Sequence, residues 1–188
     1  MNQLYPIFLK TEALSILVVG GGNVALEKLY FLFKNSPNAN VLLISENIKE
    51  EILSLKSNYQ ITFVYDRYHP KYLNWHHIVI ATTNEPETNK LIHSHCRSRN
   101  LLINVADCPP LCDFYMGGIV SKGNLKIGIS TNGKSPTLAK RLKELLQEVL
   151  PEEIDDLLIN MHTYRKTLSL SFEEKVAHLN ELTKKFIQ

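Results

Sequence analysis

The sequence predicts an α/β fold, a parallel sheet covered by helices, and three observations carry this prediction. Short apolar runs alternate with helical patterns through residues 16–105. These runs are almost continuously apolar, as strands buried on both faces should be. The first of them, Ile16-Leu17-Val18-Val19, ends in glycines, and a helical pattern begins at once. This order is that of repeated strand–helix–strand units in a parallel sheet.

The glycines form the run Gly20-Gly21-Gly22-Asn23-Val24-Ala25, which fits the pattern G-x-G-x-x-A. Gly20 would let the chain turn tightly out of the strand, and Gly22 would let the backbone approach a pyrophosphate. Ala25 would let the next helix pack close to the sheet, while that helix's free N–H groups face the phosphates. The run predicts a dinucleotide site in a Rossmann-type sheet, with a plain glycine turn as the alternative.

The other elements of this region follow in the order that such a sheet requires. An extended segment at 5–9 precedes the first strand, and the helix after the glycines continues to Lys34. The sequence Asn35-Ser36-Pro37-Asn38 then ends that helix. Apolar runs predict further strands at 41–44, 61–65, 77–81 and 101–105, with helices at 48–55 and from Pro86 onward.

The pattern changes after Asp107, where Cys108-Pro109-Pro110 breaks regular structure. Residues 118–120 and 125–130 flank Lys122-Gly123-Asn124 and predict an antiparallel hairpin. Helices are expected from Ser135-Pro136, over 152–161, and from the capping-box sequence that begins at Ser171. The apolar face of the last helix is expected to contain Val176, Leu179, Leu182 and Phe186.

Length and composition set further limits. The 188 residues suit one domain of ordinary size, or one domain with a small addition, and a net charge of +2 gives no case for nucleic acid or membrane binding. Neither a secretory signal nor a membrane-length apolar run is evident, so we expect a soluble, cytoplasmic protein. Cys96, Cys108 and Cys112 are too few for a disulfide framework and complete no tetrahedral metal site. The cluster around His93, His95 and Cys96 is expected to form a solvated or half-buried helix face.

Candidate chemistry lies where the parallel strands end, because ligands of open α/β sheets bind beyond the carboxyl ends of the strands. Ala81-Thr82-Thr83-Asn84 and Asn104-Val105-Ala106-Asp107 should meet the glycine run at that edge. Asp107 could accept a proton while a hydride leaves for a nicotinamide. The alternative is that Asp107 caps the turn before the prolines, where Asp is common.

A second candidate site is the segment Ser130-Thr131-Asn132-Gly133-Lys134-Ser135-Pro136, which joins a strand to a helix N-terminus. Its hydroxyls, glycine and lysine suit an anion. Lys140, Arg141 and Lys143 follow on the helix. The alternative is an ordinary capped helix with a solvated basic face.

These motifs, taken in order, resemble the precorrin-2 dehydrogenase family, the N-terminal module of sirohaem synthases. The resemblance spans about residues 5–150. It is carried by residues 20–25 with Lys28, by Ala81-Thr82 with Asn89, by residues 104–107, and by residues 129–139. It implies NAD-dependent oxidation of precorrin-2 to sirohydrochlorin, and in some members insertion of ferrous iron. The implied partners are the tetrapyrroles and a second copy of the chain in a homodimer.

The resemblance also implies roles for individual residues and a division of the chain. Asp107 would be the catalytic carboxylate, and the substrate would lie near Ser130, Thr131 and Lys134. The expected division is an NAD-binding domain at 1–114, a dimerisation segment at 115–150 and a helical region at 151–188. The residues expected at the cofactor are Gly20, Gly22, Asn23, Val24, Glu46, Asn47, Thr82 and Thr83.

Two departures from the family pattern affect these expectations. Tyr115-Met116-Gly117-Gly118 stands where the family usually has a proline and a small residue. The backbone of this segment is therefore expected to differ, and the family's contacts there are not assigned to these residues. Ser45 stands where a ribose-binding carboxylate is expected, with Glu46 next, which favours NAD over NADP. Residues 1–188 do not include the methyltransferase half of the fused enzymes, so we expect another protein to methylate uroporphyrinogen. Two rival hypotheses are a nucleotide-sensing module without turnover and a dimerisation protein that has lost catalysis.

Overall fold

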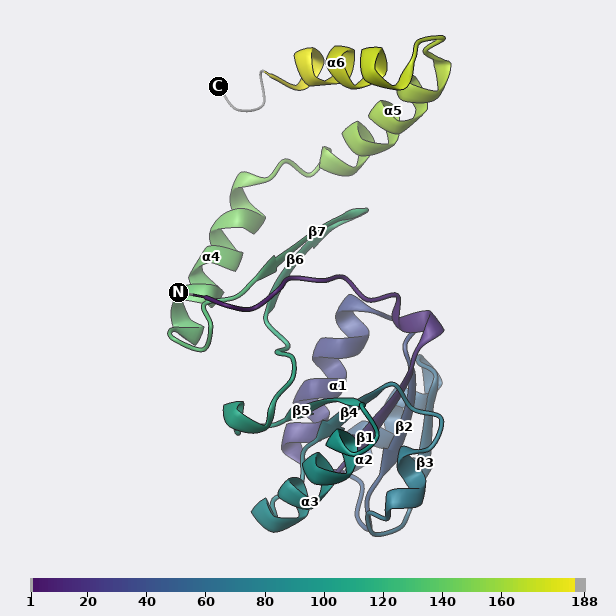
Figure 1. Cartoon of the computed structure of the whole chain (residues 1–188), viewed down its shortest axis with the longest axis vertical. Coiled ribbons are helices and arrows are strands. Elements are labelled where there is room, and N and C mark those ends of the chain that lie inside the picture. The colour runs from purple at the N-terminus through teal and green to yellow at the C-terminus, as the bar shows by residue number, and fades with distance from the viewer. Residues whose placement is uncertain (1, 185–188) are drawn as a thin grey trace. The chain divides into compact units, whose positions relative to one another are not determined.

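The computed structural model describes residues 2–184 and divides the chain into two compact units, Gln3–Met116 and a second that begins at Gly117 (Figure 1). The first unit contains a five-stranded parallel sheet of β1 (Ser15–Val19), β2 (Asn40–Ile44), β3 (Ile61–Val64), β4 (Ile78–Ala81) and β5 (Leu102–Val105). The strand order is β3-β2-β1-β4-β5. The chain therefore reverses its direction of sheet growth between β1 and β4, which is the switch point where open α/β sheets bind ligands.

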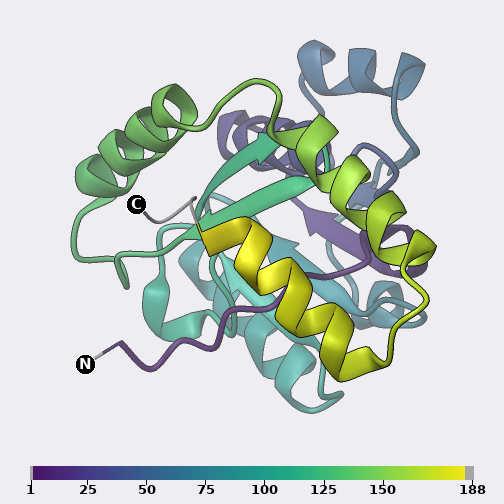
Figure 2. The ribbon, with the colours of Figure 1, turned by 90° about the horizontal axis from the view of Figure 1, so that it is seen from above.

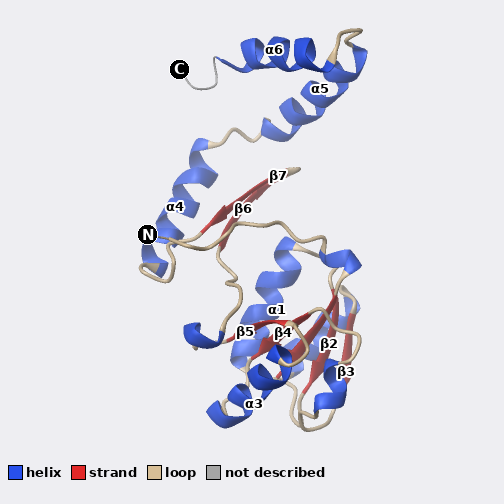
Figure 3. Ribbon diagram, in the orientation of Figure 1, coloured by secondary structure: helices blue, strands red, loops and turns tan. Residues whose placement is uncertain are grey.

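Helices cover both faces of this sheet, so its central strands β1 and β4 are buried on both sides (Figure 3). Helices α1 (Asn23–Asn35) and α2 (Glu50–Ser54) cover one face, and their buried side chains pack in one core cluster with those of β1 and β2. Helix α3 (Pro86–Arg97) and the 3-10 turn Pro70–Leu73 contribute to the core cluster on the other face. The predicted Rossmann-type architecture is confirmed.

The structure corrects two expectations in this unit. The helix predicted at 48–55 is shorter, because α2 ends at Ser54 and the chain tightens into the 3-10 turn Leu55–Ser57. The predicted half-buried face around His93 and His95 is wrong for Cys96, which is 0% exposed in the core. At helical spacing, Cys96 is on the same side of α3 as Ile92, which packs in the same cluster.

The second unit pairs β6 (Gly118–Lys122) with β7 (Leu125–Ile129) in the predicted antiparallel hairpin, and Figure 2 shows these two strands side by side. Helices α4 (Pro136–Val149), α5 (Ile154–Thr167) and α6 (Phe172–Thr183) follow. The predicted capping box forms at Ser171, whose hydroxyl accepts from the Glu174 N–H while the Glu174 carboxylate accepts from the Ser171 N–H. Phe186, predicted on the face of this last helix, lies outside the described residues.

Side-chain contacts tie the hairpin to the helical part of this unit. Lys122 Nζ donates to the Leu150 carbonyl oxygen at 2.5 Å and to Glu152 Oε1 at 2.6 Å. The Asp155 carboxylate accepts from the backbone N–H of Asn124 at 2.7 Å in the hairpin turn. Within residues 2–184, no helix is both long and apolar enough to cross a membrane.

Candidate functional site

The three glycines after β1 differ in how closely other atoms surround them. Gly20 has φ +113°, and a Cβ built on it would lie 2.7 Å from Thr82 Oγ1 and 2.8 Å from the Thr82 carbonyl oxygen. A Cβ on Gly21 would collide with the Asn47 carbonyl oxygen. A Cβ on Gly22 would meet nothing within 4 Å. Gly20 and Gly21 are therefore required by the fold itself, whereas Gly22 leaves open space at the N-terminus of α1.

The loop after β2 is fastened to this glycine loop. Lys49 N donates to the Gly21 carbonyl oxygen at 3.1 Å, and Lys49 Nζ donates to Asn23 Oδ1 at 2.7 Å. The roles of Gly21 and Lys49 do not follow from the sequence alone, because both act through contacts between segments far apart in the sequence. Asn23, one of the predicted cofactor residues, is exposed at the start of α1 with its amide oxygen held by this lysine. Lys49 therefore links the two loops, and its ammonium is also paired with Glu51 at 3.3 Å.

The two threonines after β4 have their hydroxyls committed within the protein. Thr82 is 4% exposed, and its hydroxyl donates to the Val19 carbonyl oxygen at 2.9 Å, which joins the ends of β1 and β4. The Thr83 hydroxyl donates to Asn89 Oδ1 at 2.8 Å, and Asn89 Nδ2 donates to the Thr83 carbonyl oxygen at 3.0 Å. These bonds set the shape of the sheet edge. Because both hydroxyl protons are donated within the protein, Thr82 and Thr83 would contact a ligand through their surface and backbone.

A cavity of about 380 Å³ opens at this edge, beyond the ends of β4 and β5. It brings together four of the predicted site residues, Val24, Thr82, Thr83 and Asp107. Gly20, although outside its lining, lies directly against Thr82. Glu46 and Asn47 do not line it. The other lining residues are Lys90 and Leu111, which no sequence motif singled out, together with Asn84, Pro86, Asn89, Val105, Ala106 and Cys108.

Asp107 sits at the rim of this cavity in an uncommon backbone conformation, with φ +57°. The residue is exposed, and no hydrogen bond or ion pair of its side chain occurs within residues 2–184. The following 3-10 turn, Pro109–Leu111, also has no side-chain cap. The structure therefore lacks the capping bond expected if Asp107 served only the turn. A carboxylate without a protein partner at a cavity rim is free to accept a proton.

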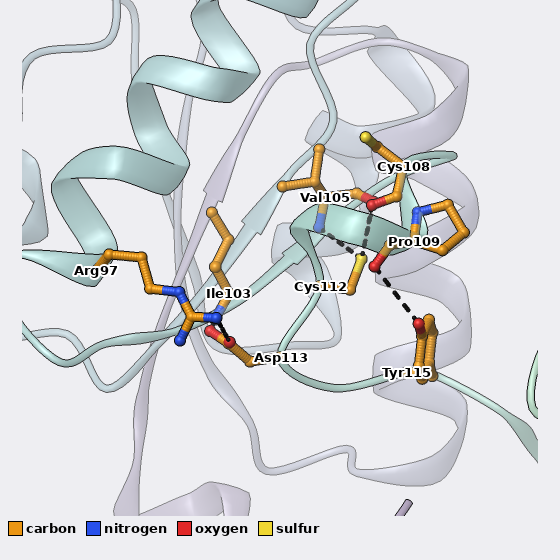
Figure 4. Close-up of polar contacts among 8 residues, drawn as sticks. All are labelled: Arg97, Ile103, Val105, Cys108, Pro109, Cys112, Asp113 and Tyr115. Atoms are coloured by element: carbon orange, nitrogen blue, oxygen red, sulfur yellow. Dashed lines mark hydrogen bonds and ion pairs between the residues drawn. The ribbon is translucent and has the colours of Figure 1, made fainter. Parts of the chain in front are cut away.

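Residues 108–115, which follow Asp107, fold back along β5 (Figure 4). Asp113 N donates to the Ile103 carbonyl oxygen at 2.7 Å, and Ile103 N donates to Asp113 Oδ2 at 3.1 Å. Arg97 contacts the other carboxylate oxygen of Asp113 at 2.9 Å. Cys112 Sγ donates to the Val105 carbonyl oxygen at 3.1 Å and accepts from Val105 N at 3.3 Å. The segment thereby satisfies the outer edge of β5, an edge that would otherwise invite pairing with another chain.

The Cys112 thiol is engaged by the backbone, and the Cys96 thiol is buried in the core. Burial raises the pKa of the Cys112 thiol, whose sulfur is already engaged by the backbone of Val105. Burial also raises the pKa of Cys96, to about 12. Within residues 2–184, no three His, Cys, Asp or Glu side chains are grouped in a way that could hold a metal ion.

Glu46, one of the predicted cofactor residues, lies beside Arg67, a cation that the sequence did not single out. Arg67 Nε donates to Glu46 Oε1 at 2.8 Å. The hydrogen bond and the charge of Glu46 raise the pKa of the Arg67 guanidinium. Asn47 contributes its carbonyl oxygen to the loop by accepting from the Ser45 hydroxyl at 2.8 Å.

The second candidate site belongs to the second unit, where the chain turns from β7 into α4. Asn132 and Gly133 have φ values of +52° and +72°. Thr131 Oγ1 accepts from Ser135 N at 3.3 Å, and Ser130 Oγ accepts from Asn132 N at 3.2 Å. Lys134 is exposed and its side chain has no ion pair within the described residues. The turn thus presents a free cation and a helix N-terminus whose Leu138 N–H is capped by the Ser135 hydroxyl.

Comparison with known proteins agrees with this geometry. A family model described as "Putative NAD(P)-binding" matches residues 7–118, and one described as "Sirohaem biosynthesis protein central" matches residues 122–148. The chain is 36% identical over 148 residues to the siroheme synthase of Psychrobacter cryohalolentis. It is 31% identical over 171 residues to that of Pseudoalteromonas translucida. These alignments cover 79% and 91% of this chain but only 28% and 36% of the two relatives.

A solved structure of "SirC, precorrin-2 dehydrogenase" has the same fold. The TM-score is 0.75 at 24% sequence identity, and the match covers 95% of this chain and 89% of that one. The first family model spans more than half of the chain and includes both the glycine loop and Asp107. The chain therefore belongs to the family described as "Putative NAD(P)-binding", and residues 122–148 also match the sirohaem biosynthesis central model.

Proposed function

We propose that the protein catalyses the NAD-dependent oxidation of precorrin-2 to sirohydrochlorin. The observation that carries the proposal is the cavity that places Asp107 at one sheet edge with Val24 and Thr82, beside the glycine loop. The siroheme synthases and the precorrin-2 dehydrogenase to which the chain is similar support the choice of substrate. NAD is the proposed cofactor because Glu46 follows β2, where a carboxylate favours the ribose hydroxyls.

The residues present fit a dinucleotide. Gly22 leaves space at the N-terminus of α1, where backbone N–H groups and the helix dipole favour phosphate. Lys49 Nζ holds the Asn23 amide oxygen at the same place and is itself paired with Glu51. When bound, NAD supplies the acceptor for the hydride that the substrate loses. Val24 and Thr82 line the adjoining cavity, where they would orient the reacting groups and exclude water.

Asp107 has the properties of the base in this oxidation. Removing a hydride from one substrate atom and a proton from its neighbour creates the new double bond, and the proton requires an acceptor. The Asp107 carboxylate is at the cavity rim and has no protein partner within residues 2–184. It would take the proton from the substrate and later release it to water.

The turn at Ser130, Thr131 and Lys134 is the proposed contact for the tetrapyrrole's carboxylates. Precorrin-2 is a polyanion, and an exposed lysine at a helix N-terminus suits such groups. Lys140 and Arg141 follow on the exposed side of α4, with Arg141 paired to Glu144 at 2.7 Å. Several weak contacts of this kind suit a large, flexible substrate better than one deep pocket.

A homodimer is part of the same proposal, with the hairpin and α4 as the dimerisation segment. Leu138, Leu145 and Val149 form a stripe along α4 and are 52%, 52% and 66% exposed. A stripe of this kind on a helix is more readily explained by a partner than by solvent. We further propose a cytoplasmic location, since all three cysteines are free thiols. Ferrous iron as a substrate stays a prediction from the family resemblance.

Turnover tests the proposal. The purified chain, mixed with precorrin-2 and NAD without oxygen, should form NADH and sirohydrochlorin in equal amounts. Light scattering should report twice the mass of one chain. Absence of turnover with either nicotinamide cofactor contradicts the proposal, and binding of NAD and tetrapyrrole without reaction would favour the regulatory or dimerisation hypotheses.

A further inference from the structure

The ends of β2 and β3 bring a carboxylate and a guanidinium together beside the dinucleotide loop. These strands are parallel neighbours, with Ile44 opposite Val64, and Ser45 N donates to the Val64 carbonyl oxygen at 3.1 Å. Because the segments after β2 and β3 leave the sheet side by side, Glu46 and Arg67 meet just beyond it. Their contact, from Nε to Oε1, is 2.8 Å long.

This place in the sheet is where the adenosine ribose of a dinucleotide is recognised. The residue directly after β2, Ser45, cannot serve freely, because its hydroxyl donates to the Asn47 carbonyl oxygen at 2.8 Å. Glu46 is therefore the first available group. Its side chain is 54% exposed and that of Arg67 is 81% exposed, so both can reach a ligand.

The two charges favour different cofactors. A carboxylate binds the 2′- and 3′-hydroxyls of NAD and repels the 2′-phosphate of NADP, whereas an arginine accommodates that phosphate. Here Arg67 reduces the repulsion by pairing with Glu46. It does so through Nε alone, and within residues 2–184 the guanidinium makes no other hydrogen bond. Its terminal nitrogens remain available for the oxygens of a phosphate.

We propose that Arg67 is the residue that reads the 2′ position of the adenosine ribose, and that the Glu46–Arg67 pair lets this site bind NADP as well as NAD. The inference rests on the proposed function only in taking a nicotinamide dinucleotide as the ligand. It concerns the binding step and requires no tetrapyrrole.

Calorimetric titration of the full chain with NAD and with NADP, without substrate, tests this inference. Arg67→Ala should weaken NADP binding about tenfold or more, the value of one lost charge-assisted contact, and change NAD binding by less than about threefold. Glu46→Gln should strengthen NADP binding several-fold, because it removes the repulsive charge. Lys56→Ala is the matched control, since this exposed lysine precedes β3 at the opposite end of the strand and its loss should alter neither affinity.

Two results would overturn the inference. One is wild-type protein that binds NAD and shows no affinity for NADP. The other is an Arg67→Ala variant that loses affinity for both cofactors equally, or for neither. If both variants change NADP affinity as expected but the protein does not oxidise precorrin-2, only the proposed function is contradicted. Failure to bind either dinucleotide would contradict both.

Discussion

Gly20 and Thr82 lie in such close contact that no side chain fits between them, since a Cβ on Gly20 would sit 2.7 Å from Thr82 Oγ1. The contact joins the ends of β1 and β4 at the switch point of the sheet. A neighbouring glycine, Gly22, has no such constraint. The fold therefore requires the glycine at position 20, whereas the glycine at position 22 is available to serve a ligand.

Alanine at these two glycines should affect different properties, protein stability at Gly20 and NAD binding at Gly22. Gly20→Ala should lower the free energy of unfolding by roughly 2 kcal/mol or more, from its positive φ and the contact with Thr82. Gly22→Ala should leave stability nearly unchanged and weaken NAD binding about tenfold or more, near 1.4 kcal/mol. Urea unfolding and NAD titration of both variants check this. Equal stabilities, or full NAD affinity in Gly22→Ala, would contradict the assignment.

Asp113 should matter more for stability than the arginine it contacts. Its side chain is 11% exposed and accepts from Ile103 N, whereas the Arg97 side chain is 63% exposed. Asp113→Ala leaves that buried N–H without a partner and should cost about 1–3 kcal/mol. Arg97→Ala removes only an exposed charge and should cost less than about 1 kcal/mol. Urea unfolding measures both losses, and the reverse order would refute this account of residues 108–115.

Cys96 should make the protein less stable in alkali. Burial raises its pKa from 9.0 to about 12, so above pH 9 the unfolded chain loses this proton while the folded chain keeps it. The stability is fully present below pH 9 and falls as the pH rises toward 12, by at most about 1.4 kcal/mol per pH unit. Urea unfolding at several pH values should give a shallower slope for Cys96→Ala. An identical slope in that variant would show that Cys96 ionises equally in both states.

The capping box of α6 gives a local test in the second unit. Ser171→Ala removes the acceptor for the Glu174 N–H and should destabilise the start of α6 by about 1 kcal/mol. Hydrogen exchange of the first-turn amides of α6 should quicken. Ser169→Ala, at an exposed position just before the helix, is the control and should leave that exchange unchanged. Equal exchange in both variants would mean that the box does not hold the helix end.

The fold was predictable from the sequence because its signals are local. The run from Ile16 to Ala25 contains the strand, the turn and the helix start in consecutive residues, and the Ser171 capping box spans four. The roles of Gly21, Lys49 and Arg67 were not predictable, because each depends on a partner brought close only by strand pairing. Residues 108–115 likewise gain their purpose from β5. The catalytic role of Asp107 stays a prediction, although its carboxylate and the cavity now have a defined place.

The proposed role of Asp107 is tested most directly by the turnover of an Asp107→Asn variant at saturating NAD and precorrin-2. Asparagine tolerates positive φ as aspartate does, so the backbone at φ +57° should persist and NAD affinity should be unchanged. The account predicts that NADH formation falls by about 10²-fold or more, the usual contribution of a positioned base. Turnover at the wild-type rate, with sirohydrochlorin as the product, would contradict it.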